Sequence, residues 1–130
     1  MKKQEKLRKL SACETLIMKL IWDSNGDIAV QDLIVRMRER YEKDYARTTM
    51  VTFLKKLSDK GYVRTYRVGR TSYVHAEKSE EQYKQQMLSE ETDFWFGGKP
   101  SRLVSALCNS QKISEDEIRS IRELLDDLDD

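Results

Sequence analysis

The sequence predicts a mainly α-helical protein with a small β-hairpin wing, in which a winged helix-turn-helix domain is followed by a C-terminal helical dimerisation region. Three amphipathic helical patterns precede two strand-like runs at 62–68 and 71–76. This is the element order of a winged helix. After the second run the balance of charge changes sign, and the remaining sequence is again helical in pattern.

The charge is unevenly distributed along the chain. Residues 1–76 hold 17 Lys and Arg against 9 Asp and Glu, whereas residues 77–130 hold 7 against 14. The two parts therefore carry +8 and −7, within a total of +1. A basic part favours a polyanionic partner, and an acidic part that keeps an apolar helical period favours a protein interface. We therefore expect two domains, 1–77 and 78–130.

Several protein classes are excluded by composition and motif. No apolar run approaches the roughly 18 residues of a bilayer span, and the charged N-terminus lacks the apolar segment of a signal peptide, so we expect a cytoplasmic protein without membrane insertion. Cys13 and Cys108 lack metal-ligand spacing and fit small buried or half-buried thiols, and His75, the only histidine, fits a structural or phosphate-neighbouring role. No metal and no cofactor are expected. The chain also lacks a phosphate loop and a paired acid and base, so it is not expected to be an enzyme.

The first two helices supply the core. Ser11 and Glu14 have the spacing of a capping box before an apolar stripe at 16–21, and a turn follows at 23–26. A second helix is expected over 30–41, with Leu33, Ile34 and Met37 inward. Its outward arginines, Arg36, Arg38 and Arg40, suit either phosphate contacts or a solvated face. The segment 27–29 can add a third strand to the wing.

The third helix is expected to begin after a cap at Asp44 and to end before Gly61. One of its faces is apolar, with Met50, Phe53, Leu54 and Leu57, and the other is hydroxylated and basic, with Thr48, Val51, Thr52 and Lys55. Such a pattern is also typical of a solvated surface helix. The basic hairpin that follows favours DNA binding.

In this arrangement the third helix would lie in the major groove of double-stranded DNA. The residues expected to contact bases are Thr48, Thr49 and Thr52, whose methyl groups can meet thymine methyl groups. The residues expected to contact phosphates are Arg47, Lys55, Lys56, Arg64, Arg67 and Arg70.

The acidic part predicts three more helices. The first spans about 79–96 and ends at Gly97-Gly98, Pro100 opens the second, and a capping box at Ser114 and Glu117 opens the third. Such helices bury too little surface to be stable alone, so a homodimer is expected; packing on the winged domain in a monomer is the alternative. The residues expected in the dimer interface are Phe94, Trp95, Phe96, Leu103, Val104, Leu107, Ile118, Ile121, Leu124, Leu125 and Leu128.

The chain resembles the BlaI/MecI/CopY-type penicillinase repressors over nearly its whole length from Leu10. The N-terminal motifs are Leu10-Ser11-x-x-Glu14-x-x-x-Met18-x-x-x-Trp22, Val30-x-Asp32-Leu33, Arg47-Thr48-Thr49-x-x-Thr52-x-Leu54-x-x-Leu57-x-x-Lys60-Gly61, Gly69-Arg70 and Tyr73-Val74. The C-terminal motifs are Phe96-Gly97-Gly98, Leu103-Val104 and Ile113-Ser114-x-x-Glu117-Ile118-x-x-Ile121-x-x-Leu124-Leu125.

The resemblance implies a dimeric transcriptional repressor that is held together by its C-terminal region and binds operators through its N-terminal domain. It also implies relief of repression by proteolysis, under a membrane sensor metalloprotease that detects β-lactams. The cut of the family falls at an Asn-Phe bond, which corresponds to Ala106-Leu107 here. The copper-responsive branch has a C-terminal cysteine cluster, and this chain has none there, so the resemblance is closer to the BlaI/MecI branch.

Residues and resemblance together predict a sequence-specific DNA-binding repressor that acts as a homodimer on palindromic operators of β-lactamase or related resistance genes. The alternative is a winged-helix protein-interaction module without sequence-specific DNA binding.

Overall fold

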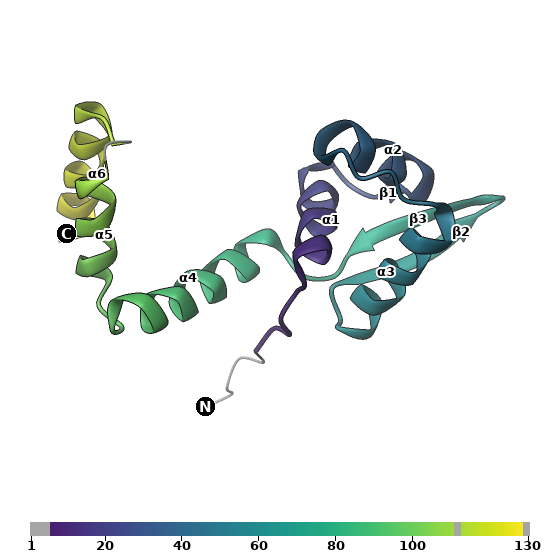
Figure 1. The fold of residues 1–130 in the computed structure, drawn as a ribbon, viewed down its shortest axis with the longest axis horizontal. Coiled ribbons are helices and arrows are strands. Elements are labelled where there is room, and N and C mark those ends of the chain that lie inside the picture. Colours follow the sequence, from purple (N-terminus) through teal and green to yellow (C-terminus); the bar gives the residue numbers. More distant parts are fainter. Residues whose placement is uncertain (1–5, 111–112, 129–130) are drawn as a thin grey trace. The chain divides into compact units, whose positions relative to one another are not determined.

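The computed structural model describes residues 6–110 and 113–128 and has a winged-helix fold followed by further helices (Figure 1). Its elements are α1 (Ala12–Asp23), β1 (Ile28–Ala29), α2 (Val30–Tyr41), α3 (Arg47–Asp59), β2 (Val63–Val68), β3 (Thr71–Ala76), α4 (Glu80–Phe96), α5 (Pro100–Asn109) and α6 (Glu115–Leu128). The predicted fold class is confirmed. The outer ends of the predicted domains 1–77 and 78–130 lie outside the described residues. Two compact units are present, of which the first ends at Gln86 and the second begins at Met87.

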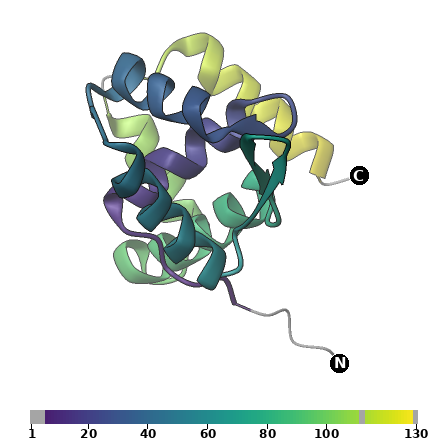
Figure 2. The ribbon, with the colours of Figure 1, turned by 90° about the vertical axis from the view of Figure 1, so that its right-hand side faces the viewer.

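The sheet of the first unit has three antiparallel strands in the order β1-β3-β2. Strands β2 and β3 pair from Val63 opposite Ala76 to Val68 opposite Thr71, and Gly69 in the turn has a φ of 62°. Figure 2 is viewed from the tip of this hairpin, with α3 beside it. The predicted third strand is present at Ile28–Ala29. Strand β2 begins one residue later than predicted, because the amide of Tyr62 donates to the Leu57 carbonyl and closes the end of α3.

One hydrophobic core joins the helices to the sheet. Helix α2 has the predicted bounds, and its three predicted inward residues are buried. In α3 the apolar face is buried as predicted, except that Phe53 is half-buried against Tyr45, with ring centroids 5.3 Å apart. The core residues are Leu10, Ile17, Met18, Leu20, Ile21, Ile28, Val30, Leu33, Ile34, Met37, Met50, Leu54, Leu57, Tyr62, Val63 and Val74.

A buried ion pair links the start of α1 to the end of α3. The predicted capping box is present: the Glu14 amide donates to Ser11 Oγ (3.2 Å), and the Ser11 amide donates to Glu14 Oε1 (2.7 Å). Glu14 Oε1 also accepts from Lys60 Nζ at 2.7 Å, although the Glu14 side chain is only 2% exposed. Its other oxygen, Oε2, is buried and has no hydrogen-bond partner among the described residues. The motif residues Glu14 and Lys60 therefore hold the domain together.

This pair predicts a pH dependence of stability. Burial alone would raise the pKa of Glu14, but hydrogen bonds from Lys60 and Ser11 outweigh it and hold the pKa below its usual 4.5. The stabilisation by the charged carboxylate is therefore complete above pH 4.5 and disappears as the pH falls through the lowered pKa. We expect Glu14→Gln to be less stable than the wild type at neutral pH and to converge with it in acid, measured by urea unfolding across pH. A constant difference would contradict this expectation.

The predicted cap at Asp44 is wrong. Ala46 is the N-cap of α3, with extended backbone angles, and no side chain of the described residues caps the helix. Because Asp44 lies two residues before the N-cap, its carboxylate is not at the position from which a side chain accepts the first-turn amides. The amides at the start of α3 are thus left without a side-chain acceptor.

In the second unit α5 and α6 contain no buried residue. Helix α4 ends at Gly97 and Gly98, both at positive φ, Pro100 is the first residue of α5, and the Glu117 amide donates to Ser114 Oγ at the start of α6. Cys108 is exposed, which contradicts the expected burial, because α5 has no core of its own in this unit. Within residues 6–110 and 113–128, no helix is both long and apolar enough to span a membrane.

Candidate nucleic-acid interface

The outer face of α3 is formed by the residues that the sequence assigns to it. Six predicted DNA-contacting residues of this helix are exposed: Arg47, Thr48, Thr49, Thr52, Lys55 and Lys56. The Thr52 hydroxyl donates to the Thr48 carbonyl (2.9 Å), so its oxygen remains able to accept a hydrogen bond. This face combines short polar side chains with cations and is open to solvent.

The cations of this face have no acidic partner within the described part of the chain. Arg47, Lys55 and Lys56 form no ion pair there, whereas Lys60, one turn further along, is committed to Glu14. Unpaired cations can neutralise DNA phosphates at a low free-energy cost, because no internal ion pair has to break first. The charge available on α3 is therefore concentrated before Lys60.

The three predicted arginines of the wing differ in their surroundings. Because Arg64 is paired with His75, and Arg67 with Ser72, the alternation of side chains places Arg64 and Arg67 on opposite faces of the hairpin. Arg64 Nε donates to Glu77 Oε1 (3.0 Å), and its guanidinium lies 5.5 Å from the centre of the Tyr66 ring. Arg64 is thus held by its own domain.

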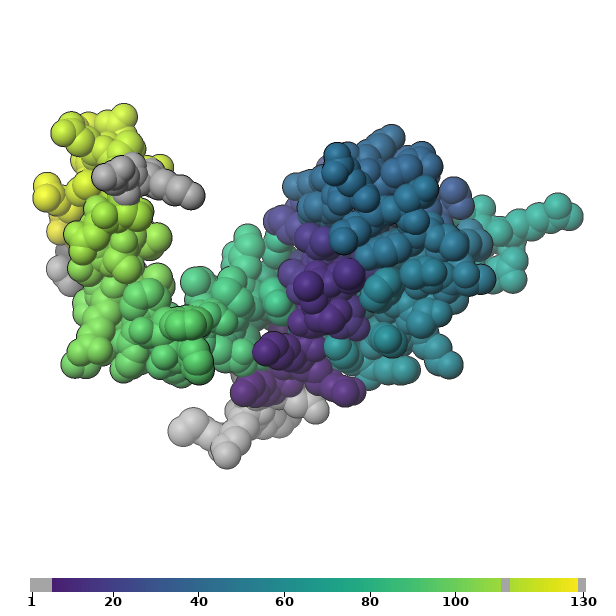
Figure 3. Space-filling view, viewed as in Figure 1, coloured from purple at the N-terminus to yellow at the C-terminus, as the bar shows by residue number. Residues whose placement is uncertain are grey.

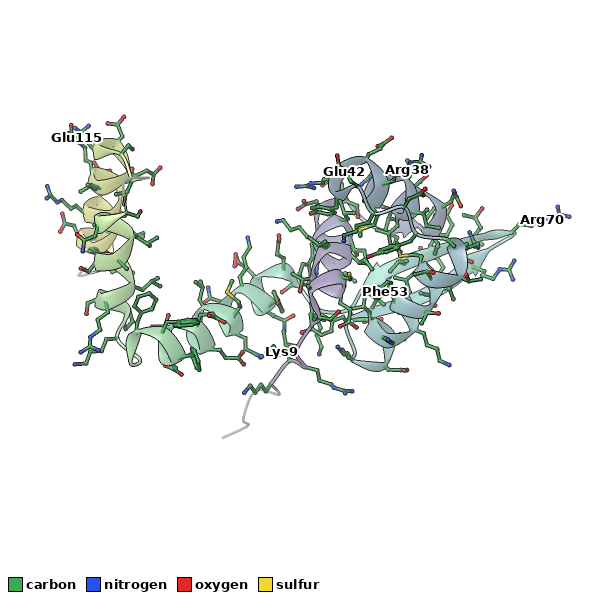
Figure 4. The ribbon with its side chains drawn as sticks, viewed as in Figure 1. Lys9, Arg38, Glu42, Phe53, Arg70 and Glu115 are labelled. Carbon is green, nitrogen blue, oxygen red and sulfur yellow. The ribbon has the colours of Figure 1, made fainter. Side chains whose placement is uncertain are left out.

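Arg67 and Arg70 are exposed and form no ion pair with any described residue. Arg70 extends from the tip of the wing (Figure 4), and the tip projects beyond the rest of its domain in the space-filling view (Figure 3). These two arginines are therefore free to meet a phosphate backbone, and the tip can do so without rearrangement of the core.

Sequence reasoning missed the role of Asp27, which anchors the wing. Its carboxylate accepts from the Tyr66 hydroxyl (2.5 Å) and lies 2.7 Å from His75 Nδ1. The hydrogen bond from Tyr66, followed by that with His75, lowers the pKa of Asp27. Tyr66 also stacks on Tyr73 with ring centroids 5.6 Å apart. No local signal reveals this anchor, because the partners lie 39 and 48 residues away.

The outward arginines of α2 are also exposed. Arg40 pairs with Asp23 at 2.8 Å, which lowers the pKa of Asp23. Arg36 and Arg38 form no ion pair within the described residues. Arg40 therefore helps to hold α2 against α1, and only the other two arginines remain available.

The residues predicted for the dimer interface form much of the exposed apolar surface of the second unit. Those that are more than a third exposed are Phe94, Trp95, Leu107, Leu124, Leu125 and Leu128. The others, half-buried, are Phe96, Leu103, Val104, Ile118 and Ile121. In α6, positions 118, 121, 125 and 128 follow a 3-4-3 spacing, which places them on one seam.

Comparison with protein families gives a match over almost the whole chain. The model of the penicillinase repressor family matches residues 10–127. The chain belongs to the penicillinase repressor family. Among solved structures, the solution structure of the DNA-binding domain of the repressor BlaI matches with a TM-score of 0.51 and 24% sequence identity, covering 62% of this chain and 94% of that chain. A comparison with curated protein sequences gives no match.

The match to this family confirms the family that the sequence motifs indicate, and the solved structure confirms the fold. In the described part of this family member, no group of three or more His, Cys, Asp or Glu side chains is arranged to hold a metal ion. The exposed face of α3 together with the wing is the candidate nucleic-acid interface.

Proposed function

We propose that this protein is a sequence-specific DNA-binding transcriptional repressor that acts as a homodimer on palindromic operators. The observation that carries the proposal is the exposed face of α3, where Thr48, Thr49 and Thr52 lie among cations without an acidic partner in the described residues. A helix of this width fits the major groove, where short polar side chains reach base edges and cations reach phosphates. The uncapped first turn of α3 adds free amides that suit a phosphate.

The second unit supports a homodimer. With no buried residue in α5 or α6, the apolar seam of α6 requires a covering surface. A second copy supplies a matching seam, because a two-fold axis brings identical patches together. Two winged domains joined in this way suit the two halves of a palindrome. The proposed domain division remains 1–77 for DNA binding and 78–130 for dimerisation.

Selection of binding sequences from random duplex DNA tests this function. We expect enrichment of an inverted repeat, bound by two copies of the chain, with an affinity that falls steeply as salt rises. Failure to enrich any sequence would instead favour the protein-interaction module, and the second unit would then be the place to seek a partner.

Two substitutions separate base reading from phosphate contact. Thr52→Ala should relax sequence preference, with operator affinity reduced by about 5- to 100-fold and random-sequence affinity retained. Arg70→Ala should weaken binding to all sequences alike and reduce the salt slope by about one. Binding titrations on the operator and on a scrambled duplex, at several salt concentrations, measure both effects. Arg64→Ala should weaken binding less than Arg70→Ala does, because the Arg64 guanidinium is already paired with Glu77. Equal losses on both duplexes for Thr52→Ala would contradict a reading role.

The proposed regulation follows the BlaI/MecI branch, with control of β-lactamase or related resistance genes and relief by proteolysis under a membrane sensor metalloprotease. The bond that corresponds to the family's cut, Ala106-Leu107, lies inside α5 with both residues exposed. Proteases cleave extended segments, so a cut there requires local unwinding of this helix. Mass spectrometry of the protein recovered from β-lactam-treated cells would locate the cut, and an intact chain in induced cells would exclude it.

A further inference from the structure

The outer face of α3 contains one side chain to which the proposed DNA contacts assign no role. Among the exposed residues of this helix, all of which the structure describes, Val51 is the one with a purely hydrocarbon side chain. It is 49% exposed, whereas Met50 and Leu54 on the inner face are buried in the core. The isopropyl group of Val51 therefore lies on the solvent side of the helix.

The stability of the fold does not require a valine at this position. A side chain that is half exposed gains little from burial in its own domain. A β-branched residue in the middle of a helix also has a lower intrinsic helix propensity than alanine. Replacement of Val51 by alanine should therefore leave the winged domain folded, and an effect of this change on DNA binding can be measured directly.

The neighbours of Val51 on the helix surface are cations that suit a phosphate backbone. Arg47 lies four residues before it and Lys55 four residues after it, so the three side chains share one side of α3. Both cations are exposed, and neither forms an ion pair within the described residues. At 1.5 Å per residue, each lies about 6 Å from Val51 along the helix axis. With both cations on phosphates, the apolar group between them faces the base edges of the major groove.

We propose that Val51 is a specificity-determining residue that recognises the 5-methyl group of a thymine in each half-site. This methyl group is the apolar feature that a base presents in the major groove. The valine side chain has no hydrogen-bond donor or acceptor, so it can favour a base only by burying apolar surface against it. The inference rests on the proposed binding of DNA by α3, and it adds an apolar contact to those assigned to the three threonines.

Replacement of single thymines by deoxyuridine tests this contact, because uracil lacks only the 5-methyl group and pairs with adenine in the same way. The full-length wild type and Val51→Ala are titrated on the selected operator and on duplexes in which one thymine of a half-site is replaced. At one thymine we expect the replacement to lower the affinity of the wild type by about fourfold, the size expected when one methyl group is no longer buried. The same replacement should have no measurable effect on Val51→Ala.

Two controls separate this contact from a general loss of affinity. Val68→Ala makes the same change at the exposed valine that ends β2 in the wing, and it should retain the sensitivity of the wild type to deoxyuridine. Replacement of the other thymines should affect the wild type and Val51→Ala alike. Circular dichroism of both variants checks that the winged domain remains folded.

Two results would overturn the inference and leave the proposed function intact. One is a wild type that binds its operator equally well whichever thymine is replaced. The other is a Val51→Ala protein that keeps the wild-type loss of affinity at every thymine. If no operator is enriched from random duplex DNA, the proposed function itself fails and the inference fails with it.

Discussion

Leu125→Asp is expected to convert the repressor into a monomer and to lower its operator affinity by about 100-fold or more. Leu125 lies on the apolar seam of α6 and is 53% exposed within the chain, so its replacement removes little internal packing. In the dimer, the introduced carboxylate would be placed in the apolar seam, where a charge without a partner is costly to bury. Each half-site would then lose the effective concentration that the linked partner provides. Analytical ultracentrifugation and operator titration measure the two effects.

Ser120→Asp is the matched control, because it places the same charge on the same helix at an exposed position off the seam. It should remain dimeric and bind the operator as the wild type does. A Leu125→Asp protein that stays dimeric would show that this seam is not the interface. A monomeric wild type would favour the alternative in which the C-terminal helices are covered within one chain.

Lys60→Met is expected to destabilise the winged domain by about 3 kcal/mol, because it leaves the Glu14 carboxylate buried without its cation. In a domain of this size the loss corresponds to a decrease of roughly 12–24 °C in melting temperature. The segment before α1 should also loosen, since Lys60 Nζ donates to the Lys9 carbonyl. Thermal unfolding followed by circular dichroism measures the loss.

Two further variants check the cause of this loss. Lys56→Met changes an exposed lysine one turn earlier on α3 and should leave the melting temperature within about 3 °C of the wild type. Adding Glu14→Gln to Lys60→Met removes the buried charge while retaining an acceptor for the Ser11 amide, so much of the lost stability should return. A double variant no more stable than Lys60→Met would indicate that the carboxylate is not the cause.

The sequence predicts most of the helices because local patterns decide them. In α2 the inward spacing of Leu33, Ile34 and Met37 predicts the helix and its buried face. The Ser11-Glu14 spacing gives the start of α1 in the same way. The cap of α3 is the exception, since Asp44 has the right side chain at a position two residues too early. The residue at the N-cap of α3, Ala46, has no side-chain acceptor and so gives no capping signal in the sequence.

The candidate site is less predictable, because long-range partners decide which cations remain available. Arg64 and Arg67 look equivalent in the sequence, yet the hairpin register separates them and Glu77 engages only Arg64. Lys60 resembles Lys56 in charge and helix, yet a carboxylate 46 residues away engages it. Only long-range contacts in the folded domain distinguish such residues. The periodicity of a helix or strand in the sequence does not reveal those contacts.

Glu14 Oε1 accepts from both the Ser11 amide and Lys60 Nζ, which ties two helix ends to one atom. The first turn of a helix ordinarily frays in advance of the rest of a domain. Here, fraying of the first turn of α1 would move the Glu14 carboxylate away from Lys60. The end of α3 would then lose its ion pair as well. The start of α1 and the end of α3 should therefore open together, so that the amides of the two helix ends show similar protection from hydrogen exchange.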